Sequence, residues 1–92
     1  MGNLKYVSSS LFLHITPINS LGNLEYVGGN LVLNYTAIQS LGNLQYVGKK
    51  LILNYTPIQS LGNLKYAGEE ISLSRNHQIP QEELTKFNFK YY

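Results

Sequence analysis

The chain has 92 residues, of which 43% are apolar and 13% are charged, a composition that indicates one small folded domain and excludes a disordered tail. Seven basic and five acidic side chains leave a net charge of +2, too small for nucleic-acid binding by charge alone. Cysteine is absent, which excludes disulfides, thiolate metal sites and cysteine nucleophiles.

The chain is built from a repeat of twenty residues. Three copies align without a gap at residues 11–30, 31–50 and 51–70, and residues 1–10 match the second half of a copy. Residues 71–92 begin as a degenerate copy and end in a segment that we expect to cap the stack. A fixed period of this length is the signature of a solenoid. We therefore predict a single domain, residues 1–92, in which each coil packs on its neighbours.

Each copy opens with alternating apolar residues, as in the run Leu31, Val32, Leu33, Asn34. This alternation predicts a short strand with Leu31 and Leu33 facing the core and the other two side chains facing outward. Identical copies stacked in the same direction form a parallel β-sheet. Twenty residues leave no room for a long helix, so the return arm should be extended or a single helical turn. The predicted fold is a repeat solenoid with little helix.

The C-terminal segment IPQEELTKFNFKYY leaves two alternatives open. Pro80 suits the first position of a helix, and the acidic residues after it suit the first turn, where they oppose the helix dipole. Leu84, Phe87 and Tyr91 would then share one face of the helix and close the core of the last coil. Alternatively, Phe87, Phe89 and Tyr91 alternate along a strand.

A polar column follows the strands, with Thr16, Thr36, Thr56 and then Asn76. The run LxLxxTxIxxL that contains it resembles the leucine-rich repeat pattern, and the spelling SLGNLxYVGG is similar to short twenty-residue repeats of that superfamily from bacteria and phages. The resemblance covers residues 1 to about 80. It implies a right-handed coil, an inward polar column bonded to neighbouring backbone as a ladder, and a binding surface on the concave sheet face. Two features depart from the family: glycine opens the strand motif, and no dedicated N-terminal cap is present.

In a stack, each repeat position becomes a stripe on the surface. Three stripes form the candidate protein-binding surface: Phe12, Val32, Ile52 and Ser72; His14, Asn34, Asn54 and Ser74; and Ile15, Tyr35, Tyr55 and Arg75. Strict alternation turns the third stripe inward, whereas the resemblance turns it outward, so its direction stays open. The apolar members would expose a few hundred Å², a patch size that is more often functional than incidental. The structural alternative is that β-branched residues simply form strands well and that the C-terminal tail partly covers them.

The sequence offers little catalytic chemistry. It contains no aspartate, its glutamates form no acid–base pair, and His14 and His77 lie at opposite ends of the stack without a carboxylate cluster. We therefore expect no enzyme activity, no cofactor and no metal site. The recurring tyrosines predict a structural ladder of stacked rings, with a sugar or nucleobase platform as the alternative: Tyr6, Tyr26, Tyr46 and Tyr66.

The N-terminal end lacks a counterpart to the C-terminal cap. Half a coil precedes the first full strand, so Leu4, Leu11 and Leu13 should lie at an open end of the core. Proteins rarely leave such an edge unprotected. We therefore expect a second chain to cover it, either another copy in a homodimer or the biological partner.

These patterns predict a non-catalytic module that binds a protein partner through the concave sheet face, with Asn34, Asn54, Ser72 and Ser74 supplying hydrogen bonds. The resemblance to phage and bacterial repeats implies a more specific version, a phage-encoded inhibitor of a host factor such as an anti-CRISPR protein. The alternative is a structural protomer that homo-oligomerises through its N-terminal end. The sequence shows no signal peptide and no run near the ~20 apolar residues of a membrane span, so we expect a cytoplasmic protein, in the host cytoplasm if viral.

Overall fold

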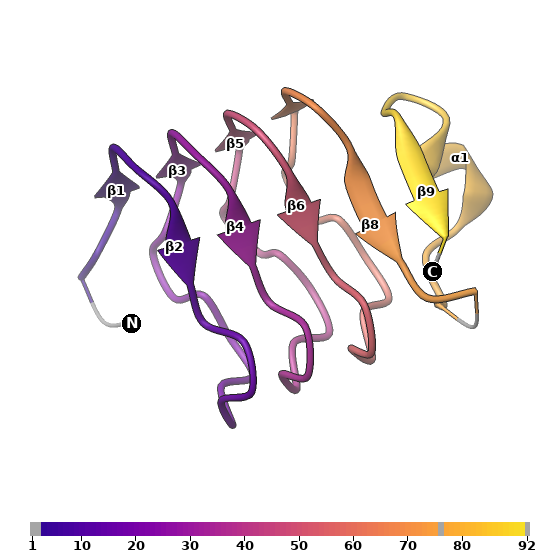
Figure 1. Cartoon of the computed structure of the whole chain (residues 1–92), viewed down its shortest axis with the longest axis horizontal. Helices are drawn as coiled ribbons and strands as arrows, with labels where there is room; N and C mark the ends of the chain where they lie inside the picture. The colour runs from indigo at the N-terminus through magenta and orange to yellow at the C-terminus, as the bar shows by residue number, and fades with distance from the viewer. Residues whose placement is uncertain (1–2, 76, 92) are drawn as a thin grey trace.

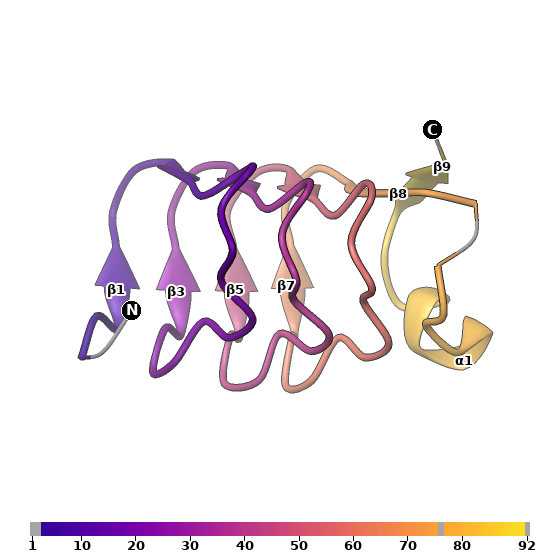
Figure 2. The same cartoon turned by 90° about the horizontal axis from the view of Figure 1, so that it is seen from below.

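In the computed structural model, which describes residues 3–75 and 77–91, the chain forms a parallel β-solenoid of about four turns (Figure 1). The predicted repeat solenoid is confirmed, but each coil contributes two short strands rather than one. The first sheet contains β1 (Tyr6–Val7), β3 (Tyr26–Val27), β5 (Tyr46–Val47) and β7 (Tyr66–Ala67). The second sheet contains β2 (Leu11–Phe12), β4 (Leu31–Val32), β6 (Leu51–Ile52), β8 (Ile71–Leu73) and β9 (Phe89–Tyr91). Figure 2 shows the coils side by side along the axis of the stack.

Strand pairing follows the repeat period. Tyr6 pairs with Tyr26 in the first sheet, and Leu11 pairs with Leu31 in the second, so equivalent residues stack on adjacent coils. Backbone hydrogen bonds join the coils, as where the Leu31 amide donates to the Lys50 carbonyl at 2.9 Å. Because these bonds connect the backbone, the register does not depend on side-chain ion pairs.

The hydrophobic core fills the inside of the coils, between the two sheets and the return arms, and is made of stacked leucine, isoleucine and valine columns. Leu24 and Leu44 are fully buried, and Leu64 in the same column is also buried, with a relative exposure of 9%. The first-coil member, Leu4, is 41% exposed because only one neighbouring coil covers it. A column of identical side chains therefore runs from an exposed end to a fully packed centre.

One glycine column allows the coils to approach closely. A Cβ placed on Gly48 would lie 2.8 Å from the carbonyl carbon of Gly28 and would overlap its oxygen. Gly68 has the same relation to Gly48. The first coil carries Ser8 at this position, where no preceding coil is present among the described residues. This close backbone approach explains the departure from the leucine-rich repeat pattern at the start of the strand motif.

In each of the three full repeats, a left-handed residue lies three positions after the second strand. Ile15, Tyr35 and Tyr55 have φ values of 57°, 62° and 58°, which interrupt the alternation and turn these side chains outward. The following threonine then points inward, and the Thr36 hydroxyl donates to the Leu33 carbonyl at 2.8 Å. The Thr16 and Thr56 hydroxyls bond within their own coils in the same way, so the expected ladder of threonines between coils is wrong. Asn76, the last member of the predicted column, lies outside the described residues.

The C-terminal segment uses both alternatives that the sequence left open. A single helical turn, α1 (Gln81–Leu84), buries Leu84, and β9 then adds a parallel strand to β8 (Figure 2). Pro80 is the N-cap rather than the first helical residue. The Glu83 carboxylate accepts a hydrogen bond from the Leu61 amide at 2.9 Å, which ties the cap to the previous coil. Within the described ranges, the fold has no helix long and apolar enough to cross a membrane.

Candidate protein-interaction surface

The outer face of the second sheet carries the first predicted stripe, and its exposure falls steadily along the stack. Phe12 on β2 is 61% exposed, Val32 and Ile52 on the central strands are half-buried, and Ser72 on β8 is buried. Ser72 has a small side chain between two paired strands, and its hydroxyl donates to the Asn54 amide oxygen. The expectation that Ser72 belongs to an exposed stripe is therefore wrong.

The third stripe forms the most exposed apolar row of the surface. Ile15 is 72% exposed, Tyr35 is 55% exposed and Tyr55 is 59% exposed. The Tyr35 and Tyr55 rings stack with centroids 4.8 Å apart and planes 12° from parallel. The left-handed backbone at these residues settles the direction that the sequence left open, since it places all three side chains outside the coil.

The polar stripe is mostly occupied by contacts within the solenoid. The Ser74 hydroxyl accepts a hydrogen bond from the Tyr55 amide at 2.8 Å, and Ser74 is buried. Asn34 and Asn54 are half-buried. Their backbone carbonyls accept hydrogen bonds from the backbone amides of Ile15 and Tyr35, the left-handed residues of the preceding coil. His14 on the first coil is exposed. Ser74, like Ser72, is thus misplaced by the sequence prediction, because β9 extends the sheet over the last coil.

Arg75 is exposed next to the C-terminal strand. Its guanidinium carbon lies 5.7 Å from the centre of the Tyr91 ring, a cation–π distance. The His77 ring stacks on the same tyrosine with centroids 5.5 Å apart, and its Nδ1 accepts from the Ile79 amide at 3.1 Å. His77 therefore supports the cap. Residues 3–75 and 77–91 contain no cluster of three or more potential metal-ligating side chains.

The tyrosines of the first sheet form the predicted ladder. Successive rings, from Tyr6 through Tyr26 and Tyr46 to Tyr66, stack with centroids 4.4 to 4.8 Å apart. Desolvation, followed by the charges and hydroxyls of the neighbouring rings, raises the pKa of Tyr26 above 10.0. The raised pKa keeps the Tyr26 phenol neutral at physiological pH, which favours its close stacking between two neighbouring rings.

The N-terminal end of the core is open in part. Leu4 is exposed, and Leu11 and Leu13 are half-buried, whereas the equivalents of all three are buried in the next coil. These three residues are where the sequence places them, at the edge of the stack beside β1 and β2. Whether a second chain covers them stays a prediction.

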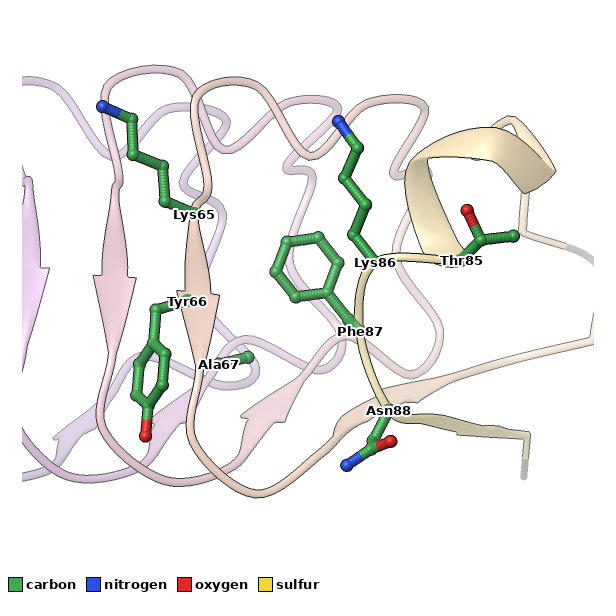
Figure 3. A pocket seen from close by; sticks show the side chains of 7 residues that line it. All are labelled: Lys65, Tyr66, Ala67, Thr85, Lys86, Phe87 and Asn88. Carbon is green, nitrogen blue, oxygen red and sulfur yellow. The ribbon is translucent and has the colours of Figure 1, made fainter.

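A groove beside β7 was not foreseen from the sequence. It has a volume of about 290 Å³ and lies between β7 and the segment that joins α1 to β9 (Figure 3). Its lining residues are Lys65, Tyr66, Ala67, Thr85, Lys86, Phe87 and Asn88. The repeat pattern gives no signal for this groove, because it depends on where the non-repeating segment runs.

Comparison of the chain with protein-family models, with curated proteins and with solved structures found no match. The leucine-rich repeat resemblance therefore stays a resemblance of sequence pattern.

Proposed function

We propose that the chain is a non-catalytic protein-interaction module that binds a protein partner through the outer face of its second sheet and the turns that follow the strands, in the cytoplasm. The observation that carries the proposal is the exposed row of Ile15, Tyr35 and Tyr55 next to exposed Phe12. Aromatic side chains of this kind are enriched at protein interfaces because they bury a large area with few rotatable bonds.

The size of this surface fits recognition of another protein. The four side chains and their half-buried neighbours offer a few hundred Å² of apolar area. At about 25 cal/mol per Å², burial of such a patch supplies roughly 5 to 10 kcal/mol before the costs of association. A small module that covers a functional face of its partner acts as an inhibitor or an adaptor. A phage-encoded inhibitor of a host factor, such as an anti-CRISPR protein, is the version suggested by the repeat resemblance.

Affinity capture from a lysate of the encoding organism, followed by cross-linking, tests the proposal. We expect the wild-type chain to retain a partner whose cross-links lie on the second sheet, and the double variant Tyr35→Ser with Tyr55→Ser to lose it. The matched control is Tyr6→Ser, because Tyr6 is equally exposed but lies on the first sheet. The proposal fails if the folded double variant retains every partner of the wild type, or if Tyr6→Ser loses the same partner.

A second candidate function is a structural protomer that homo-oligomerises through its N-terminal end. The exposure of Leu4, in a column that is otherwise buried, favours this alternative. Size-exclusion chromatography with light scattering at micromolar concentration tests it, with Leu4→Lys as the disrupting variant. A dimer that becomes a monomer in this variant supports the alternative, whereas a wild-type monomer contradicts it.

A further inference from the structure

The two sheets end at different levels of the stack. The second sheet continues from β8 to β9, whereas β7 is the last strand of the first sheet among the described residues. The Ile71 amide donates to the Asn88 carbonyl at 2.8 Å, just as the Leu51 amide donates to the Glu70 carbonyl at 3.0 Å. Asn88 therefore continues the repeat register in the second sheet. The residues before it, 85–87, follow α1 in the chain and lie across the groove from β7 (Figure 3).

Strand β7, which lines the groove, and the turn that follows it carry hydrogen-bond acceptors along the edge of the first sheet. In the preceding coil, the Val47 carbonyl accepts from the Gly68 amide at 2.9 Å, and the Lys49 carbonyl accepts from the Glu69 amide at 3.1 Å. The corresponding carbonyls one coil later belong to Ala67 and Glu69. No donor in the described part of the chain bonds to either of them. The repeat geometry points both carbonyls away from β5 and toward the open side of the sheet.

The walls of the groove suit an extended peptide. Phe87 packs against the core and turns its ring toward β7, so it forms an apolar floor next to Ala67 (Figure 3). Lys65 and Lys86 line the same end of the groove from its two sides (Figure 3). The exposed ring of Tyr66 ends the tyrosine ladder with one face unstacked by any described residue.

We propose that this groove binds an extended segment of another protein, which adds a parallel strand to β7. The main-chain amides of the segment donate to the carbonyls of Ala67 and Glu69, as the amides of each coil do to the coil before it. This surface is distinct from the outer face of the second sheet, so the inference stands independently of the proposed function.

The repeat geometry also defines the sequence of the segment. An acidic residue lies beside Lys65 and Lys86, and an aromatic residue stacks on Tyr66 as the neighbouring rings stack on each other. An apolar residue then faces Phe87. Glycine follows in the segment. A Cβ on Gly68 would overlap the carbonyl of Gly48, and in the same way a Cβ on the segment residue beside Gly68 would overlap the carbonyl of Gly68. The predicted segment is therefore acidic, aromatic, apolar and glycine, in that order.

A second copy of this chain does not fit the groove through its own N-terminal strand. Its Lys5 would lie beside Lys65, placing like charges on adjacent strands. Its Ser8 would place a Cβ where the repeat requires glycine. Its Leu11, four residues after β1, would compete with β9 for the edge of β8. The N-terminal strand of a second copy is therefore excluded as the occupant, and the proposed segment belongs to a different protein.

Titration of the ¹⁵N-labelled chain with the blocked peptide NEYVGKN, followed by NMR, tests the inference. We expect amide shift changes confined to residues 65–69 and 85–88. Replacement of the peptide glycine by sarcosine removes one main-chain donor and should weaken binding about fivefold or more. Replacement of the same glycine by valine should weaken binding at least about tenfold, because the added side chain overlaps the β7 edge.

A charge exchange provides the matched control. The double variant Lys65→Glu with Lys86→Glu should bind NEYVGKN about fivefold more weakly and should bind NKYVGKN more tightly than the wild type does. The inference is overturned if NEYVGKN causes no shift changes up to about 5 mM. It is also overturned if the changes lie on the second sheet, or if the sarcosine and valine peptides bind as well as NEYVGKN.

Discussion

Replacement of Gly48 by alanine tests the close approach of coils that defines this solenoid. Gly48 lies in the centre of the stack, and its amide donates to the Val27 carbonyl at 2.8 Å. The added Cβ would overlap the backbone carbonyl oxygen of Gly28, a residue whose amide donates to the Val7 carbonyl of the coil before it at 2.8 Å. Neither atom can move without changing the spacing between two coils. We therefore expect the unfolding free energy to fall substantially.

The magnitude follows from two opposing effects. Overpacking in a well-packed interior costs about 1 to 3 kcal/mol, and a backbone obstacle places this site at the upper end of that range. The lower entropy of alanine in the unfolded chain returns about 0.5 kcal/mol. The net loss is about 2 to 2.5 kcal/mol. For a domain of this size, each kcal/mol lowers the Tm by about 4 to 8 °C, so we expect a decrease of about 10 to 20 °C.

Thermal unfolding followed by circular dichroism measures this effect against two controls. Gly42→Ala adds a Cβ in open space at φ +56°, so it should cost only about 1 kcal/mol of left-handed strain. Ser8→Gly changes the same column in the first coil and should alter stability by less than about 1 kcal/mol. A Gly48→Ala variant no less stable than Gly42→Ala would refute the steric argument.

Three further changes test the packing, the ladder and the left-handed turn. Leu44→Ala, in the fully buried centre of its column, should lower the unfolding free energy measured in urea by about 3 to 5 kcal/mol. Leu4→Ala, in the exposed first coil, should lower it by less than about 1 kcal/mol, and equal losses would contradict the packing gradient. Because the pKa of Tyr26 is raised in the folded state, this tyrosine contributes stability that is fully present below pH about 10 and is lost as the pH rises through the raised pKa. Between pH 9 and 11, the unfolding free energy of the wild type should therefore fall more than that of Tyr26→Phe. Ile15→Gly removes about 1 kcal/mol of left-handed strain from an exposed residue but adds about 0.5 kcal/mol of unfolded-state entropy, so it should raise the Tm by only about 2 to 4 °C in calorimetry. A lower Tm would contradict the strain argument.

The repeat made the architecture predictable from the sequence. Once the copies are aligned, leucine at a given position must lie above leucine at the same position of the next coil. The buried column of Leu24 and Leu44 and the tyrosine ladder follow from this alignment alone. The exposure of Leu4 was predictable for the same reason, since the first coil has only one neighbour in the described stack.

Local backbone conformation was not predictable in the same way. Alternation describes a strand only while the backbone stays extended, and Tyr35 has left-handed φ although tyrosine gives no sequence signal for it. The burial of Ser72 and Ser74 depends on β9, which lies outside the repeat and adds a strand beside them. Residues of the non-repeating segment, such as Phe87, take their places from tertiary packing rather than from periodicity.

The left-handed turn links the core of each coil to its exposed surface. If Tyr35 were extended, its ring would face the core and Thr36 would face solvent, so the turn both buries the threonine and displays the tyrosine. Large side chains at this conformation cost about 1 kcal/mol each, and the chain uses glycine at its other left-handed position, as in Gly42. The stacking of the Tyr35 and Tyr55 rings on each other stabilises the fold by about 1 kcal/mol, which offsets part of the strain at these two residues. Ile15 has no stacking partner in the described structure and is the most exposed of the three, so its strain is not offset within the fold. The strained and exposed Ile15 side chain therefore supports the proposed interaction surface, because the packing of the solenoid alone gives no reason for it.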